Sequence, residues 1–339
     1  MKISSHSWLC VPLLLVLGCA AAPQRPEWVA GTSTAYPDSR YLVGRGQGSS
    51  PALARDRARA DLAKNFRVAV SAETRDLLAY TSRSDGDGQS SELASEVSRH
   101  IVTRTDQVIE GVKIVEQWQP EEGGENHALA VLDRLQAGNQ LRRLIDELDR
   151  DTDLRLQRAR AGDALLPKIG DATAALAAQV ERRHYQDYLA VVDRTGVGVP
   201  PRHDPVRLKS DLDALLTRVA IRTRVSADPL GGLEKALGGA IAAAGFVHAD
   251  DASAGAYSLD GASVVEDLAG KDGWYWVRGR VELTLREPDG NRVLGTHSWP
   301  LKVSAQQPEA ARMRATEQIA ATLARELRGV VVRFGAPQE

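Results

Sequence analysis

The stretch YLVGRGQGSSPALARDRARADLA, residues 41–63, predicts how the first folded domain is built. Residues 41–43 are a short apolar run that predicts a strand, and glycines separate this run from an alanine-rich segment. Ser50 is a residue type preferred just before a helix, and Pro51 suits the first helical turn. Apolar side chains then recur at every fourth position, which places them on one helix face: Ala54, Ala58, Leu62 and Phe66.

The glycines between strand and helix resemble a nucleotide-phosphate loop, but their spacing is wrong for one. Gly44, Gly46 and Gly48 read G-x-G-x-G, whereas the dinucleotide fingerprint is G-x-G-x-x-G and position 49 is Ser. The phosphate loop of NTPases requires Gly-Lys-Ser/Thr, and no Lys follows here. We therefore expect no nucleotide and interpret the glycines as small residues that allow a tight strand-to-helix turn.

The rest of the first domain follows from alternating apolar patterns. The segment RVAVSAE, residues 67–73, predicts a half-buried strand, and a second helix is expected at 91–104. HALAVLD, residues 127–133, predicts a strand that pairs with the one before it. That earlier strand is expected to carry three apolar side chains on one face: Val112, Ile114 and Trp118. The order of elements predicts an α+β sandwich.

The chain after this domain divides into three segments. Residues 136–195 are charge-rich with apolar stripes, which predicts a pair of helices that Pro167 helps to separate. Their alternating charges indicate a solvated face, and a coiled-coil dimer remains an alternative. Residues 196–206 read as a linker, and residues 207–335 predict a second α+β domain. The fold class is thus α+β, with two small α/β sandwich-type domains joined by a helical segment.

A Pro-Asp-Gly turn near residue 289 predicts a hairpin in the C-terminal domain. Its first strand alternates, and one face carries Tyr275, Val277, Val281, Leu283 and Leu285. The opposite face carries Trp274, Trp276, Arg278 and Arg280. Trp and Arg are enriched where proteins bind one another, so these four residues are a candidate partner surface. The alternative is that a helix covers the Trp side chains and that Arg stacks on them.

The N-terminus predicts where the protein is located. Lys2 precedes an apolar run that is too short to span a bilayer, so residues 1–18 read as a signal peptide. The run ends in Val16, Leu17, Gly18 and Cys19, which resembles the lipobox of bacterial lipoproteins. That resemblance implies cleavage before Cys19 and a covalent lipid on it, with residues 19–27 as a tether. An ordinary signal peptide with an incidental Cys is the alternative.

Composition and motifs exclude several classes of function. The formal net charge is −2, which does not favour nucleic acid as a partner. The His residues show no helical ligand spacing, so no metal site is expected. SDGDGQ, residues 84–89, lacks the terminal Glu of a calcium-binding loop. No nucleophile elbow is present, and we expect no cofactor beyond the lipid on Cys19.

Several spaced elements of the first domain together resemble a known family. They are Trp28, Tyr36-Pro37, YLVGRGQG, the alanine-rich helix ending ADLAKNFRVAVSAE, and the strand pair GVKIVEQW and HALAVLDR. This pattern, over residues 28–135, resembles the LPP20 family of bacterial lipoproteins. The N-terminal domain of flagellar assembly protein T is similar. The resemblance implies an envelope lipoprotein without a known enzymatic activity, and it gives no catalytic residues to transfer.

These observations predict a non-enzymatic lipoprotein of the outer membrane that faces the periplasm. Ala20 follows the lipobox Cys, whereas Asp at that position commonly marks inner-membrane retention in Gram-negative lipoproteins. We expect a scaffold or assembly accessory that binds envelope proteins. Alternatives are a peptidoglycan-binding module or activator of a cell-wall synthase, and a flagellar basal-body accessory. An enzyme ranks third because the sequence contains no catalytic motif.

Overall fold

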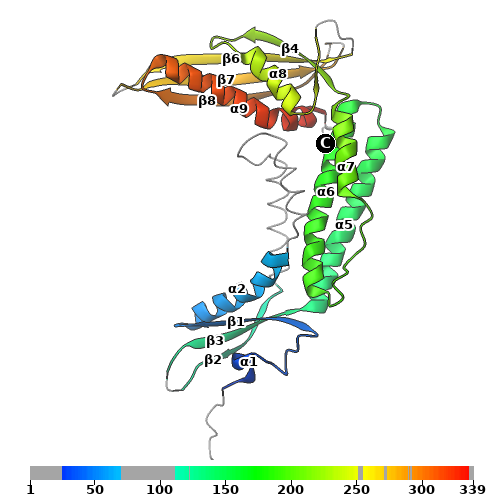
Figure 1. The fold of residues 1–339 in the computed structure, drawn as a ribbon, viewed down its shortest axis with the longest axis vertical. Helices are drawn as coiled ribbons and strands as arrows, with labels where there is room; N and C mark the ends of the chain where they lie inside the picture. The colour runs from blue at the N-terminus through cyan, green and yellow to red at the C-terminus, as the bar shows by residue number, and fades with distance from the viewer. Residues whose placement is uncertain are drawn as a thin grey trace, which may run out of the picture.

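The protein consists of two mixed α/β domains at the ends of a long helical hairpin, and both domains project from the same side of the hairpin (Figure 1). The predicted α+β class is confirmed. The predicted signal peptide and the helix at 91–104 lie outside the described residues. The computed structural model describes these parts of the chain: residues 25–69, 111–121, 123–250, 255–270, 273–288, 290 and 292–335.

The N-terminal domain is a three-stranded antiparallel sheet with helices on both faces. Its strands are β1 (Tyr41–Gly48), β3 (Asn126–Asp133) and β2 (Lys113–Trp118), in that spatial order. The helix α2 (Pro51–Ala69) packs on one face and the short α1 (Glu27–Ala30) lies on the other. From α1, Trp28 is buried against Leu129 and Val131.

The glycines of the opening stretch lie inside β1 and do not form a turn. None has a positive φ angle, and the connection to α2 is only Ser49 and Ser50. A methyl group on Gly46 would overlap the carbonyl oxygen of Ala54 and the nitrogen of Ala58. The tight-turn interpretation is therefore wrong. The glycines are small because the backbone of α2 lies directly on the strand.

The helix α2 begins and packs as the sequence predicts. The backbone N–H of Leu53 donates to Ser50 Oγ at 3.2 Å, which makes Ser50 the N-cap. The predicted face is buried along its whole length. The strand predicted at residues 67–73 is wrong at its start, because residues 67–69 continue the helix. Phe66 keeps this last turn packed by an edge-on contact with Tyr188, with ring centroids 5.2 Å apart.

A β-bulge in β2 makes the predicted face of this strand wrong for Trp118. Ile114 pairs with Ala130, but the next pair is Glu116 with Leu129, so Val115 is an extra residue. Because side chains alternate along a strand, the extra residue moves every later side chain to the opposite face. Trp118 therefore packs on the α1 side of the sheet, not on the side of Ile114 as predicted.

Two antiparallel helices form the hairpin, α5 (Arg134–Ala161) and α6 (Leu165–Val192). Asp133 caps α5 by accepting from Leu135 N at 2.9 Å and Gln136 N at 3.1 Å. The predicted apolar stripes are buried between the helices and the domains: Leu141, Ile145, Leu148, Leu176, Val180, Leu189 and Val192. Pro167 lies in the first turn of α6, where a missing N–H breaks no helical bond, so it does not end a helix.

The sequence predicts that the charges of the hairpin lie on a solvated face, but some of them are buried. Asp149 and Arg182 are buried and form an ion pair between the helices, with Nε and Oδ1 2.9 Å apart. Gln179 Nε2 donates to the same carboxylate oxygen at 3.2 Å and to Thr152 Oγ1 at 2.8 Å. A continuous polar network therefore joins the two helices in their middle.

Residues 193–204 run back along the hairpin and are held to it, although the sequence reads as a linker. Arg182 Nη2 donates to the carbonyls of Val199 and Pro200 at 3.2 and 3.0 Å. Gln186 accepts from Val199 N at 3.0 Å. The segment leads into α7 (Pro205–Leu216), which Asp204 caps through Val206 N at 2.9 Å.

The C-terminal domain is a five-stranded sheet in the order β5-β4-β6-β7-β8, with β4 parallel to its two neighbours. Two helices, α8 and α9, pack on one face of this sheet (Figure 1). The bounds are β4 (Ala220–Ala227), α8 (Leu233–Ala243), β5 (Val247–His248), β6 (Tyr257–Ala269), β7 (Tyr275–Arg286), β8 (Val293–Ala305) and α9 (Pro308–Gly335).

The two larger hydrophobic cores both contain residues of α6. Leu166, Ile169 and Leu176 belong to the core beneath the five-stranded sheet. Tyr185 and Leu189, from the second half of the same helix, belong to the core around α2. One continuous helix therefore connects the two domains.

We predict that Gly46→Ala destabilises the N-terminal domain by about 3 kcal/mol, since the added methyl group overpacks a backbone contact. Urea unfolding measures the change. Gly239→Ala is the control, because nothing lies within 4 Å of that exposed helical glycine, and it should stabilise by about 1 kcal/mol. Equal stability of Gly46→Ala and the parent would contradict close backbone packing of α2 on β1.

We predict that Asp149→Ala destabilises the protein by about 4 kcal/mol, because Arg182 then remains buried without its carboxylate. Asp149→Leu combined with Arg182→Met should be less damaging than either change alone. Denaturant titration of the parent, Asp149→Leu, Arg182→Met and the double variant forms a double-mutant cycle. The control is Arg150→Ala, which breaks an exposed pair with Asp146 and should cost less than about 1 kcal/mol. Additive effects in the cycle would rule out coupling.

Candidate functional site

The face of the C-terminal sheet opposite α8 and α9 contains the residues that the sequence singles out. The register aligns Trp276 with Leu268 and Ser304, and Arg278 with Glu266 and Lys302. Residues in register on neighbouring strands share a face, so these side chains form rows across β6, β7 and β8. The other face of β7 is the predicted apolar one, and its central residues are buried: Val277, Val281, Leu283 and Leu285.

The four candidate residues differ in exposure. Arg278 and Arg280 are exposed, Trp276 is half-buried, and Trp274 is 41% exposed. Trp274 precedes β7, in the turn where its carbonyl accepts from Gly270 N at 2.7 Å. The alternative that a helix covers the Trp side chains does not hold for the described helices of this domain, because α8 and α9 pack on the opposite face.

Local contacts explain why Trp276 is partly covered. Lys302 Nζ lies 5.1 Å from the centroid of the Trp276 ring, within the range of a cation–π interaction. Arg280 pairs loosely with Glu282 at 3.5 Å. Arg278 makes no hydrogen bond or ion pair within the described part of the chain, so its guanidinium is available to another molecule.

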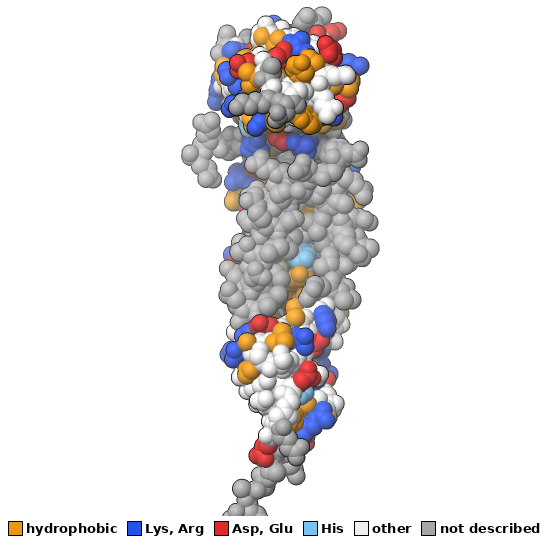
Figure 2. All heavy atoms as spheres, turned by 90° about the vertical axis from the view of Figure 1, so that its left-hand side faces the viewer, with side chains coloured by type: hydrophobic (Ala, Val, Ile, Leu, Met, Phe, Trp, Pro, Cys, Tyr) orange, Lys and Arg blue, Asp and Glu red, His pale blue; other side chains and the backbone are white. Residues whose placement is uncertain are grey.

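Apolar side chains extend this surface beyond the predicted residues. Val264 is 51% exposed and Leu268 is 38% exposed. Figure 2 shows hydrophobic side chains among basic and acidic ones on the exposed end of this domain. We name the surface the Trp276 face, and it consists of Val264, Glu266, Leu268, Trp274, Trp276, Arg278, Arg280 and Lys302.

Four members of the Trp276 face are not among the residues that the sequence predicts. Val264, Glu266 and Leu268 lie on β6, a strand that the sequence does not predict, and Lys302 lies on β8. The turn alone would not have identified Lys302, because the register shifts by one residue between Leu285 and Arg286, and only after this shift does Lys302 lie opposite Arg278. A binding surface assembled across strands cannot be recognised from one strand alone.

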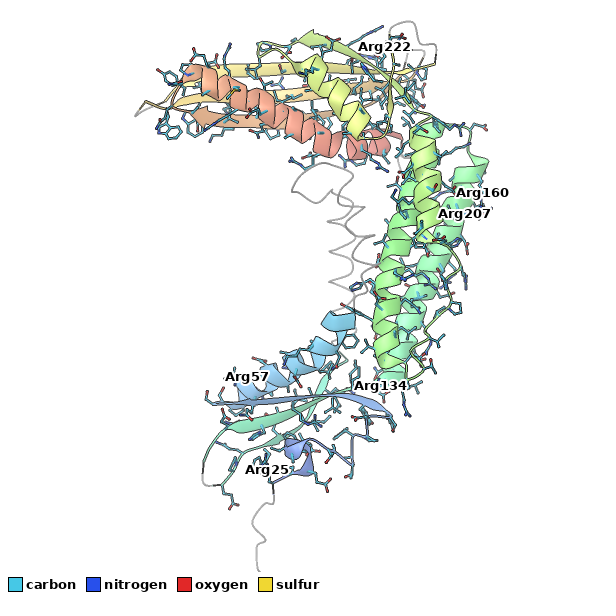
Figure 3. The ribbon with its side chains drawn as sticks, viewed as in Figure 1. Arg25, Arg57, Arg134, Arg160, Arg207 and Arg222 are labelled. Carbon is cyan, nitrogen blue, oxygen red and sulfur yellow. The ribbon has the colours of Figure 1, made fainter. Side chains whose placement is uncertain are left out.

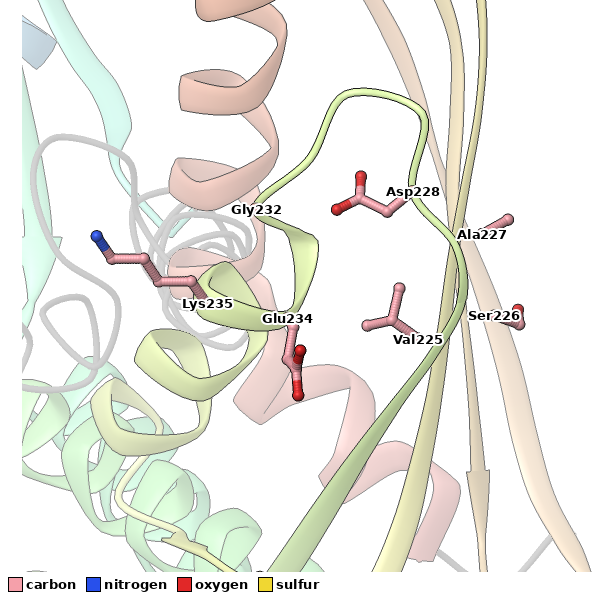
Figure 4. Close-up of a pocket in the computed structure, with 7 residues that line it drawn as sticks. All are labelled: Val225, Ser226, Ala227, Asp228, Gly232, Glu234 and Lys235. Atoms are coloured by element: carbon pink, nitrogen blue, oxygen red, sulfur yellow. The ribbon is translucent and has the colours of Figure 1, made fainter.

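A hollow of about 500 Å³ lies between the end of β4 and the start of α8 (Figure 4). Two carboxylates line it, Asp228 and Glu234. Asp228 accepts from Gly231 N at 3.1 Å, Leu233 N at 2.8 Å and Ser263 Oγ at 3.3 Å. These donors occupy both oxygens, so Asp228 is explained as a structural cap of the loop before α8.

His184 is a buried histidine whose pKa is lowered. It is 6% exposed on α6, its ring lies 4.3 Å from that of Tyr188, and neither ring nitrogen has a hydrogen-bond partner in the described structure. Burial lowers its pKa to about 4, and nearby Asp187 opposes the shift. His184 is therefore neutral at pH 7 and packs as an aromatic ring.

The described residues contain neither a metal-binding cluster nor a membrane-spanning helix. No cluster of three or more His, Cys, Asp and Glu residues there could hold a metal ion. None of the helices in the described ranges has both the length and the hydrophobicity needed to cross a bilayer. The lipobox residues Val16, Leu17, Gly18 and Cys19 precede residue 25 and lie outside the described structure.

Comparison with known proteins finds a family that the first domain resembles. Residues 26–133 match the LPP20 lipoprotein family. The resemblance of the opening domain to LPP20 lipoproteins is thereby confirmed over a segment that includes β1, α2, β2 and β3. The similarity to flagellar assembly protein T stays a prediction.

Solved structures show weaker likeness. A secreted protein of Helicobacter pylori is 13% identical with a TM-score of 0.41, and the match covers 88% of this chain and 99% of that one. A minor lipoprotein of Acinetobacter baumannii is 18% identical with a TM-score of 0.25, over 34% of this chain and 87% of that one. No curated protein matches the sequence.

We predict that acid destabilises the parent protein more than a His184→Phe variant. The unfolded chain binds a proton at His184 below about pH 6.5, whereas the folded chain resists protonation until about pH 4. The contribution of His184 to the free energy of unfolding is thus fully present above pH 6.5. It is lost as the pH falls toward 4, and the loss amounts to about 3 kcal/mol. Urea unfolding between pH 4 and 8 measures the difference.

His248→Gln is the matched control, because His248 is exposed on the sheet-edge strand β5. Its pH dependence should follow that of the parent. If the unfolding free energy of His184→Phe had the same pH dependence as that of the parent, burial would not prevent protonation of His184.

Proposed function

We propose that the protein is a non-enzymatic lipoprotein that is anchored in the outer membrane through a lipid on Cys19. In this proposal it faces the periplasm and acts as a scaffold that binds other envelope proteins. The match of residues 26–133 to LPP20 lipoproteins supports the class. The short tether of residues 19–27 would then hold the folded body close to the membrane surface.

The observation that carries the scaffold proposal is the composition of the Trp276 face. It combines aromatic side chains and unengaged or weakly engaged cations with exposed Val264 and Leu268. Trp and Arg are enriched at the centres of protein interfaces, and the buried core of an interface is more apolar than the remaining surface. A fully solvated sheet face would favour shorter polar side chains, as at Thr296 and Ser298 on β8.

The hairpin also suits a scaffold, because it holds two domains apart and on one side (Figure 1). Its buried Asp149–Arg182 pair and the attached segment 193–204 favour one fixed arrangement. A scaffold that positions partners needs fixed distances between its binding surfaces.

We predict that a photoreactive amino acid at position 278 crosslinks to discrete envelope proteins in cells. The same amino acid at Glu317, which is exposed on α9, is the control for random collisions. Trp276→Ala should abolish the products at 278 and leave the protein folded, at a cost of about 2 kcal/mol because the ring is half-buried. Identical products at both positions, or none at 278, would remove the interface.

The anchor is tested separately by fractionating cells that express the parent or Cys19→Ser. The parent should be recovered with the outer membrane, and Cys19→Ser should be recovered in the soluble periplasm, because the acyl chains that hold it are missing. Recovery of both in the same fraction would contradict lipid anchoring at Cys19.

A further inference from the structure

A hollow of about 750 Å³ lies where the upper end of the hairpin meets α7. It shares no residue with the Trp276 face. It is lined by the end of α5, the start of α6, residues 202–204 and one side of α7. Its volume lies within the range of pockets that enclose small organic ligands. The LPP20-matching region contributes no residue to it.

The rim of the hollow carries an excess of unpaired positive charge. Arg160 from α5, Lys168 from α6, and Arg207 and Arg218 from α7 line it. None of these four side chains makes a hydrogen bond or ion pair within the described ranges of the chain. Figure 3 shows Arg160 and Arg207 beside each other at the upper end of the hairpin.

The other charged groups of the lining do not cancel this excess. Arg202 is already paired with Asp146 at 3.1 Å, and His203 contacts Asp153 at 2.9 Å. The carboxylate of Asp204 accepts from Val206 N as the cap of α7. Asp211 is thus the one lining carboxylate without a described partner, against four cations without one.

The wall behind these cations is apolar. Leu156 and Ala159 come from α5, Ala172 from α6, and Leu208 and Leu215 from α7. Leu208 and Leu215 also pack against the core of the C-terminal domain, so the wall is held by the fold. A ligand that satisfies this hollow therefore needs both an anionic group and an apolar part.

We propose that this hollow binds an amphipathic anion, a molecule with a phosphate head and an alkyl tail. The planar guanidinium groups of Arg160 and Arg207 suit the oxygens of phosphate, which Arg binds through paired N–H donors. The tail lies along the apolar wall of Leu156, Leu208 and Leu215. The site is separate from the Trp276 face and independent of the scaffold proposal.

The test is calorimetric titration of the chain from residue 19 onward, with Cys19→Ser so that no detergent is needed. The probes are dodecyl phosphate below its micelle concentration, inorganic phosphate, and the neutral dodecyl maltoside. Dodecyl phosphate should bind with one site per chain. Inorganic phosphate should bind at least tenfold more weakly, and dodecyl maltoside should not bind detectably.

Paired variants locate the site. Arg160→Gln with Arg207→Gln should weaken dodecyl phosphate at least tenfold, because the phosphate loses two charged donors. The control is Arg55→Gln with Arg143→Gln, which removes the same charge from α2 and the opposite end of α5 and should leave binding unchanged. Circular dichroism confirms that each variant is folded.

Three results would overturn the proposal. Equal binding of inorganic and dodecyl phosphate would mean that the apolar wall contributes nothing. Equal binding of dodecyl maltoside would mean that the cations contribute nothing. Equal losses in the two double variants would mean that the probe responds to overall charge and not to this hollow.

Discussion

The structure depends on one helix that belongs to two hydrophobic cores. The first half of α6 packs through Leu166 and Ile169 beneath the C-terminal sheet, and the second half packs through Tyr185 and Leu189 against α2 and its sheet. A continuous α-helix has a fixed rise per residue, so the spacing of these side chains sets the distance between the domains. The same helix supplies Arg182, Gln179 and Gln186, which hold α5 and residues 193–204. The domains therefore cannot separate unless one core or this polar network is disrupted.

The network in the middle of the hairpin does what apolar residues there could not do. A purely apolar seam allows two helices to slide by a turn at modest cost, whereas a buried Asp149 and Arg182 must meet at one register. Arg182 also donates to two carbonyls of residues 193–204, and this fixes the returning segment on the hairpin. Because this segment leads into α7, the same guanidinium group also restrains the start of α7. Apolar replacement would cost specificity of arrangement more than stability.

Local periodicity predicted the elements, and long-range packing decided what the sequence could not. Ala54 to Phe66 at every fourth position and Ser50 as a cap predict α2 correctly, because those signals act within one helix. The neighbouring sequence does not show why residue 46 must be glycine, because the atoms that exclude a side chain there belong to α2. Alternation predicts the wrong face for Trp118 because a single extra residue, Val115, reverses it. For the candidate surface, β7 alone predicted Trp276 and Arg278, whereas Val264 and Lys302 join them only through strand pairing.

The open face of the C-terminal sheet follows from how that domain is joined to the hairpin. The helices α8 and α9, together with α7 and the start of α6, contribute to one core beneath the sheet, which absorbs the inward side chains of β7 and β8. Among the described elements, no helix remains to cover the opposite face of the sheet, and Leu268 and Trp274 are exposed there. Strand alternation then forces Arg278 outward whenever Val277 is buried inward. The packing that connects this domain to the hairpin is thus the reason that its aromatic and basic residues face solvent.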